Sequence, residues 1–165
     1  KFLKYGIDLA PLGLEQRAGD ETYFCTPKGA KVIGWAGVDG IHFCFIRRFG
    51  EMVFAVSPMN VVPDYVHPLA RNFSDFLSLL LACGDSAALE QAWQWNFEQF
   101  QAFLADNPPT EEQKTVLARI SRQTGLSPIE EPWQYLHELQ DTFDYSKIKY
   151  TEDCISAAPG VEGLL

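Results

Sequence analysis

Cysteine and histidine are side chains with the chemistry to bind a zinc ion. Cys25, His42 and Cys44 are separated by sixteen residues and then by one, a spacing that matches no common zinc site. His42 and Cys44 would share a face of one strand, because side chains two residues apart in a strand point the same way. Between a zinc site and a packed core at these positions we predict the core, with no metal and no cofactor.

A thiol nucleophile is the second chemistry that these residue types allow. It would need a cysteine beside a histidine base and a third group that orients the base. Cys25 with His42 or His67 is the candidate set, but nothing in the sequence joins these residues. His67 stands in a proline-rich segment, where we expect an exposed and incidental side chain. None of the cysteines forms a Cys-x-x-Cys pair, so we predict four reduced structural thiols, Cys25, Cys44, Cys83 and Cys154.

Nucleotide-binding and serine-activating motifs are missing from the sequence. It contains no Gly-x-Ser-x-Gly, no Walker-type loop and no Gly-x-Gly-x-x-Gly. The carboxylate pairs Glu111-Glu112 and Glu130-Glu131 open predicted helices, where negative charge complements the helix dipole. We find no catalytic constellation and predict that the protein is not an enzyme.

The charge of the chain is unevenly distributed. Residues 1–71 carry eight Lys/Arg and seven Asp/Glu, whereas residues 72–165 carry five and fifteen. Direct nucleic-acid binding is not expected, because phosphate contacts require a basic face. The acidic half suits a basic protein partner, since opposite potentials speed association; the alternative is that this charge only keeps the protein soluble.

Trp95 is the aromatic residue most suggestive of a partner surface. On a helical wheel it lies about 160° from Trp93, because two residues advance about 200°. Either the helix is buried on two sides, which we favour, or one tryptophan is partly exposed and anchors a partner. The candidate partner contacts are Trp95, Glu98, Glu130, Glu131 and Asp141.

Two apolar strands joined by a charged turn form the predicted centre of the fold. Residues 41–46 have no plainly polar face, which predicts a central strand covered on both sides. Residues 47–51 form the turn, in which Gly50 can adopt a positive φ, and residues 52–56 return. Further short strands are expected at 2–9, 21–26 and 31–36, so the sheet should be a mostly antiparallel meander.

The rest of the chain is typical of helices that follow a crossover. Residues 57–71 carry three prolines, which predicts a stiff, extended crossover. Four helices are then expected: one opened by Asn72 or Ser74 and ended by Gly84, one from Asp85 towards Asp106, one opened by a capping box at Thr110–Gln113, and one opened by a capping box at Ser127–Glu130.

These elements predict a single α+β domain over residues 1–165, with a mostly antiparallel sheet from the N-terminal half packed against about four helices from the C-terminal half. Its parts would be strand-rich 1–60, crossover 61–71, helical 72–145 and a tail 146–165 that docks back. The first residues are too polar for a signal peptide, and no apolar run reaches the length of a membrane span. We therefore expect a cytoplasmic protein without membrane contact, and the sequence indicates no oligomeric state.

The centre of the chain resembles the SUKH superfamily, which includes fungal glucan-synthesis regulators and many bacterial proteins. The similarity covers residues 20–83 and lies in the aromatic strand Ile41-His42-Phe43-Cys44-Phe45, the hairpin return through Phe54, and the helix start Phe73-Ser74-Asp75-Phe76-Leu77. Members commonly begin with a helix and a Leu-Pro…Asn-Gly-Gly segment; this chain has Leu9-Ala10-Pro11-Leu12-Gly13 and no Asn-Gly-Gly.

The resemblance implies a binding role. Bacterial members are thought to act as immunity proteins, each neutralising a toxin effector, and many such toxins are basic nucleases. The family has no established catalytic residues to transfer. A competing hypothesis is a small-molecule-binding protein or enzyme with a pocket between sheet and helices, near Trp35, His42 or Cys25, and a third is a regulatory scaffold with several partners.

Overall fold

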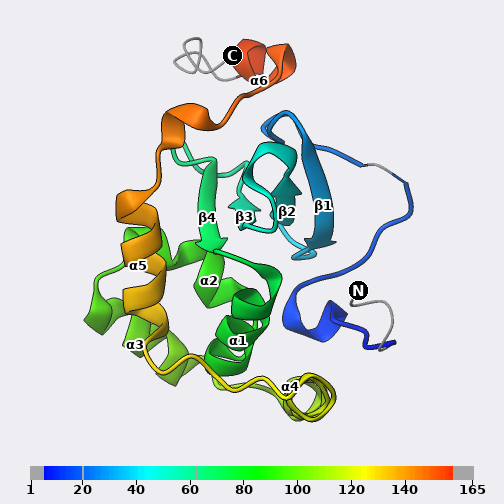
Figure 1. Ribbon diagram of the computed structural model, residues 1–165, viewed down its shortest axis with the longest axis vertical. Coiled ribbons are helices and arrows are strands. Elements are labelled where there is room, and N and C mark those ends of the chain that lie inside the picture. Colours follow the sequence, from blue (N-terminus) through cyan, green and yellow to red (C-terminus); the bar gives the residue numbers. More distant parts are fainter. Residues whose placement is uncertain (1–5, 20, 62, 158–165) are drawn as a thin grey trace.

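A four-stranded antiparallel sheet stands at the centre of the computed structural model, which describes residues 6–19, 21–61 and 63–157. Its strands lie side by side in chain order, as Figure 1 shows, and the helices follow them in the sequence. The strands are β1 (Ala30–Trp35), β2 (His42–Ile46), β3 (Val53–Val56) and β4 (Val66–Ala70). The predicted α+β class and antiparallel meander are confirmed.

The β2–β3 hairpin forms where the sequence predicted it. Phe43 pairs with Ala55 and Cys44 with Phe54, and all four side chains are buried. A 3-10 turn, η3 (Arg47–Phe49), joins the strands and ends at Gly50, whose φ of 65° favours glycine.

β4 corrects the prediction of an extended crossover. The proline-rich segment turns back and pairs with β3, with Pro68 opposite Phe54. Proline is tolerated because β4 is an edge strand, where an outward-facing residue needs no ladder hydrogen bond. The Pro68 carbonyl instead accepts a hydrogen bond from the Gln140 side chain at 3.1 Å.

Neither of the two predicted N-terminal strands is present in the described residues. Residues 2–5 lie outside the described residues, and residues 6–9 belong to no strand but lead into a 3-10 turn, η2 (Ala10–Leu12). Residues 21–26 are irregular apart from a turn at Phe24 and Cys25, and Cys25 is fully buried against the sheet face rather than paired at its edge.

The predicted helix from Asp85 to Asp106 is two helices. After α1 (Phe73–Cys83), α2 (Ala87–Gln91) continues into η4 (Ala92–Gln94), and α3 (Phe97–Asp106) starts anew. Asn96 caps α3, because its side chain accepts from the Gln99 amide while the Gln99 side chain accepts from the Asn96 amide. The two tryptophans therefore do not share one α-helix, so the helical-wheel argument does not hold, and both side chains are half-buried.

One of the two predicted capping boxes is real. Thr110 and Gln113 cap α4 (Glu111–Thr124) reciprocally. The Ser127–Glu130 box does not form, because the Ile129 amide donates to the Ser78 carbonyl of α1 and holds this segment extended. α5 (Pro132–Thr142) begins later, and the chain ends with η5 (Tyr145–Lys147) and α6 (Glu152–Ala157).

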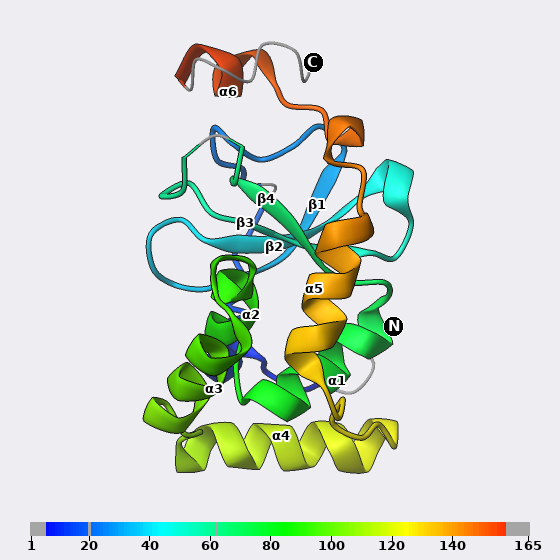
Figure 2. The same ribbon diagram turned by 90° about the vertical axis from the view of Figure 1, so that its left-hand side faces the viewer.

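The sheet has a hydrophobic core on each face, as predicted for a central β2. One core lies between the sheet and the helices and includes Phe43, Phe76 and Leu136. The second lies on the other face, where Ile148 and Tyr150 of the tail pack on the sheet, so the predicted docking of the tail is confirmed. Figure 2 shows α4 and α6 at opposite ends of the molecule.

Candidate functional site

The starts of α3 and α5 meet at a partly exposed group of aromatic side chains. The Trp133 indole nitrogen donates a hydrogen bond to the Trp95 carbonyl at 3.0 Å. Phe97 meets the Trp133 ring edge-on, with ring centroids 5.8 Å apart. Because Phe97 is 40% exposed, this contact leaves an apolar side chain at the surface of a tightly held ring.

Trp133 is fixed in place by its other neighbours. The His137 ring stacks on it with centroids 4.2 Å apart, and His137 Nε2 donates to the Ala92 carbonyl at 2.8 Å. Trp133 and His137 of α5 are thus hydrogen-bonded to backbone carbonyls at both ends of η4, at Trp95 and Ala92. These contacts hold the partly exposed Trp133 ring in place. Trp95 is half-buried and packs on Phe103 with centroids 4.7 Å apart.

Carboxylates border these rings. Glu98 follows Phe97 at the start of α3, and Glu130 and Glu131 precede α5; all three side chains are exposed. Glu131 is the N-cap position of α5, in keeping with the predicted place of this pair at a helix start. We call this set the aromatic–acidic surface: Trp95, Phe97, Glu98, Glu130, Glu131 and Trp133.

Four of the five predicted partner contacts belong to this surface, and Asp141 does not. Asp141 is exposed in the last turn of α5, nine residues after Pro132 and so roughly 14 Å along the helix. Phe97 and Trp133 were missed because the helical pattern placed Phe97 on a core face. The spacing of Asn96 and Gln99, typical of a capping box, was the signal that could have placed Phe97 at a helix start.

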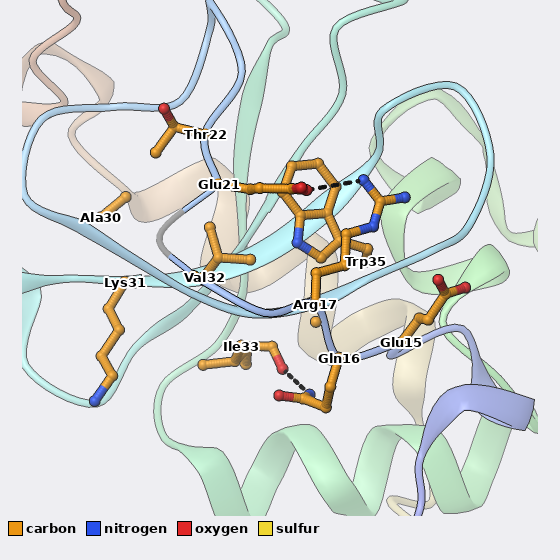
Figure 3. A pocket seen from close by; sticks show the side chains of 12 residues that line it. Glu15, Gln16, Arg17, Glu21, Thr22, Ala30, Lys31, Val32, Ile33 and Trp35 are labelled. Carbon is orange, nitrogen blue, oxygen red and sulfur yellow. Dashed lines mark hydrogen bonds and ion pairs between the residues drawn. The ribbon is translucent and has the colours of Figure 1, made fainter.

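A groove runs beside the outer edge of β1. A hollow of about 260 Å³ lies between β1 and the segment that includes Glu15, Arg17 and Glu21. A neighbouring one of about 430 Å³ continues towards the β1–β2 turn and shares Arg17, Glu21, Thr22 and Trp35 with it. Figure 3 shows Arg17 and Glu21 joined in front of the Trp35 ring. The groove lies outside the sheet edge, whereas the sequence hypothesis placed a pocket between sheet and helices.

Arg17 spans this groove. Its guanidinium lies 4.3 Å from the centroid of the Trp35 ring and 3.4 Å from a Glu21 carboxylate oxygen. Both charged side chains are partly exposed, so water screens the pair and it contributes little to stability. The Arg17–Glu21 ion pair closes the groove only weakly, so a charged group that enters the groove can replace it.

His42 lies beneath Trp35 and has both ring nitrogens occupied. Nδ1 donates to the Gly40 carbonyl at 2.9 Å, which leaves Nε2 to accept from the Thr26 hydroxyl, also at 2.9 Å. Burial lowers the pKa of His42, so the neutral ring that this arrangement needs is favoured. Within the described residues no group of three His, Cys, Asp or Glu side chains could hold a metal.

The cysteines are buried and free, as predicted. Burial raises the pKa of the Cys25 thiol to about 12, and does the same for Cys44. These thiols stay protonated at neutral pH, and a protonated thiol is a poor nucleophile.

His67 corrects the expectation of an exposed loop residue. It lies in β4, is 8% exposed and stacks on Trp93 with centroids 4.7 Å apart. Nδ1 shares a 2.7 Å hydrogen bond with the Tyr145 hydroxyl. Nε2 lies 3.0 Å from Asp64 Oδ1, and burial lowers the pKa of His67 against the opposing effect of Asp64. The ring joins β4 to the tail.

Comparison with known proteins adds no relative. No protein-family model matches the chain, and no curated protein or solved structure matches it. No helix in the described parts of the chain is long and apolar enough to cross a membrane.

Proposed function

We propose that the protein is a non-catalytic protein-binding module, and that the aromatic–acidic surface is its contact site. The observation that carries the proposal is a partly exposed Phe97 on a rigidly held Trp133, bordered by exposed carboxylates. Tryptophan and other aromatic anchors dominate the binding free energy of protein interfaces. Carboxylates at the rim favour a basic partner and speed the encounter with it.

The kind of partner follows from the charge of the helical half. Residues 72–165 carry five basic and fifteen acidic side chains, which repel acidic proteins and attract basic ones. An immunity protein that neutralises a basic toxin is a role of this type, and it is also what the resemblance to the SUKH superfamily implies. A regulatory scaffold would bind several proteins through the same surface.

The test compares two variants with the same change of charge. Glu98→Gln, Glu130→Gln and Glu131→Gln are combined in one protein, and Glu51→Gln, Glu152→Gln and Asp153→Asn, all exposed, in the control. Each is used for affinity capture from extract of the source cell, and the captured protein is then titrated at rising salt. We expect roughly tenfold slower association for the first variant only.

A second variant separates the aromatic contact from the charge. Phe97→Ala removes a partly exposed ring and should weaken binding about tenfold through faster dissociation. Loss of its edge-on contact with Trp133 should lower the free energy of unfolding by about 0.5–1.5 kcal/mol. An equal fall in association rate for the triple-glutamate variant and its control would show that only the total charge matters. Capture of the partner that none of the three variants changes would refute the proposal.

A further inference from the structure

The two edges of the sheet differ in what covers them. Along β4, helix α5 covers the edge, and Gln140 binds the Pro68 carbonyl. Along β1, the described residues form a single bridge, between Glu15 and Trp35, and the Gln16 side-chain amide donates to the Ile33 carbonyl at 2.6 Å. Among residues 6–19, 21–61 and 63–157, no strand lies on the outer side of Ala30–Val32. Open edges of this kind are templates for another strand.

The backbone groups of Val32 face this open edge. Arg47 donates its amide to the Gly29 carbonyl, and Trp35 exchanges both of its backbone groups with Glu15 on the outer side. Because successive residues of an antiparallel strand alternate between inward and outward hydrogen bonding, Lys31 faces β2 and Val32 faces outward. The bulge at Ile33 lies between Val32 and Gly34 in the β1–β2 register and turns the Ile33 carbonyl outward as well.

The groove beside this edge runs along the strand. Its two hollows share Arg17 and Trp35 and together follow β1 from Ala30 to the turn at Gly40. Six residues of extended strand span roughly 20 Å. A strand added to β1 would pair with the open stretch Ala30–Val32 and place a side chain over Val32, in the manner of peptides that bind by strand addition. Its first residues would lie in the groove in front of the Trp35 ring, because the backbone groups of Trp35 are already bonded to Glu15.

Charge along the groove selects the direction of the occupant. Lys31 lines one end, whereas Glu15 and Asp39 line the hollows at the other. A chain antiparallel to β1 would bring its first residues to the Trp35 end and its last residues to Lys31. The complementary peptide therefore carries a basic residue early and an acidic residue, or its carboxylate end, late.

We propose that the open edge of β1 binds an extended peptide segment of a partner protein, antiparallel to β1, as a fifth strand of the sheet. The segment has a basic residue near Asp39 and an acidic one near Lys31. This site is separate from the aromatic–acidic surface, so either proposal can fail without the other. On binding, the segment's basic or polar groups replace the Arg17–Glu21 closure, which lies at the same end of the groove as Asp39.

The test uses a displayed library of heptapeptides of the form Lys-Xaa5-Asp, selected on the full chain, with an Asp-Xaa5-Lys library as the matched control. Peptides selected from the first library are expected to bind in a one-to-one ratio. On binding, the Val32 amide should gain protection from hydrogen exchange, while the Lys31 amide, already bonded to β2, should not change.

Two variants test the geometry. Val32→Pro removes the outward N–H and should weaken binding roughly tenfold, with circular dichroism confirming that the sheet is intact. Lys31→Glu should weaken it roughly twofold to fivefold and should favour peptides whose last residue is lysine, a reversal that does not depend on the proline variant folding.

Three results would overturn the proposal. The first is equal selection from both libraries or from neither. The second is binding that leaves Val32 exchange unchanged, which would indicate a ligand held by the groove side chains alone. The third is a dimer in sedimentation that Val32→Pro dissociates, which would assign the edge to a second copy of this chain.

Discussion

At the level of single residues, burial sets the protonation of the groups inside this protein. It raises the pKa of Cys25 and Cys44 and lowers the pKa of His42 and His67. Glu90 of α2 follows the same rule: burial first, and the nearby Asp39 second, raise its pKa from 4.5 to about 7. The sequence contains no local signal of these shifts, because they depend on which residues the fold buries.

Glu90 gives the protein a stability that depends on pH. Its folded-state pKa lies above its ordinary value, so the folded protein holds the proton more tightly than the unfolded chain does. This contribution is complete below pH 4.5 and is lost as pH rises through 7. Glu90→Gln should therefore raise the free energy of unfolding on the order of 2 kcal/mol at pH 8 and leave it unchanged at pH 4.5.

Denaturant unfolding of both proteins at several pH values measures this difference. His42 and His67 titrate equally in the two proteins, so their effects cancel. Asp39→Asn serves as a comparison and should give a smaller gain of the same sign, because Asp39 is the lesser cause. A difference that stays constant between pH 4.5 and 8 would contradict this account of Glu90.

The hydroxyl of Tyr145 should stabilise the fold through His67. Tyr145→Phe leaves His67 Nδ1 without its 2.7 Å partner in a buried place, which should lower the free energy of unfolding by about 1–2 kcal/mol. Tyr23→Phe is the control, because Tyr23 is 46% exposed. Equal midpoints for the two variants in denaturant would mean that water replaces the tyrosine hydroxyl at no cost.

At the level of elements, two structures that depend only on neighbours in the chain were predicted correctly. The β2–β3 hairpin and the Thr110–Gln113 cap of α4 are local, so the sequence contains all of their information. β4 was missed because three prolines suggest a break, yet Pro68 is tolerated where its edge faces Gln140. The Ser127–Glu130 capping pattern failed because a distant backbone group, the Ser78 carbonyl, binds the Ile129 amide.

In the candidate site, too, local features could be predicted from the sequence and long-range contacts could not. Exposed carboxylates such as Glu98 and Glu131 could be chosen from charge and helix position alone. The contact of Phe97 with Trp133 could not, because these residues stand 36 positions apart in the chain and meet only through the packing of α3 against α5. The groove at β1 was likewise invisible, since residues 15–22 show no pattern that places them beside a strand.

The tail acts as the cover of the second core. Ile148 is 1% exposed and packs with residues of the sheet face, so Ile148→Ala should lower the free energy of unfolding by about 2–4 kcal/mol. Lys147→Ala, at an exposed neighbouring position, should change it by less than about 0.5 kcal/mol. Similar denaturant midpoints for the two variants would show that the tail does not contribute to the core.

At the level of the whole molecule, the two halves of the chain differ in charge and in the surface that each one carries. The sheet half is nearly neutral and holds the open edge of β1, whereas the helical half carries the excess of carboxylates and the aromatic–acidic surface. The sheet needs both of its covers, the helices on one face and the tail on the other. The proposed surface for a basic partner is therefore carried by α3 and α5, of which α5 packs against β4 of the sheet.

Site-specific photocrosslinking tests this account most directly. A benzophenone-bearing amino acid is placed at Phe97 in one protein and at Met59, which is 71% exposed, in another, and both are irradiated in extract of the source cell. The account predicts a crosslink from position 97 to a basic protein, lost at high salt, and none to that protein from position 59. A partner that crosslinks as strongly from position 59, or one captured without any crosslink from position 97, would contradict it.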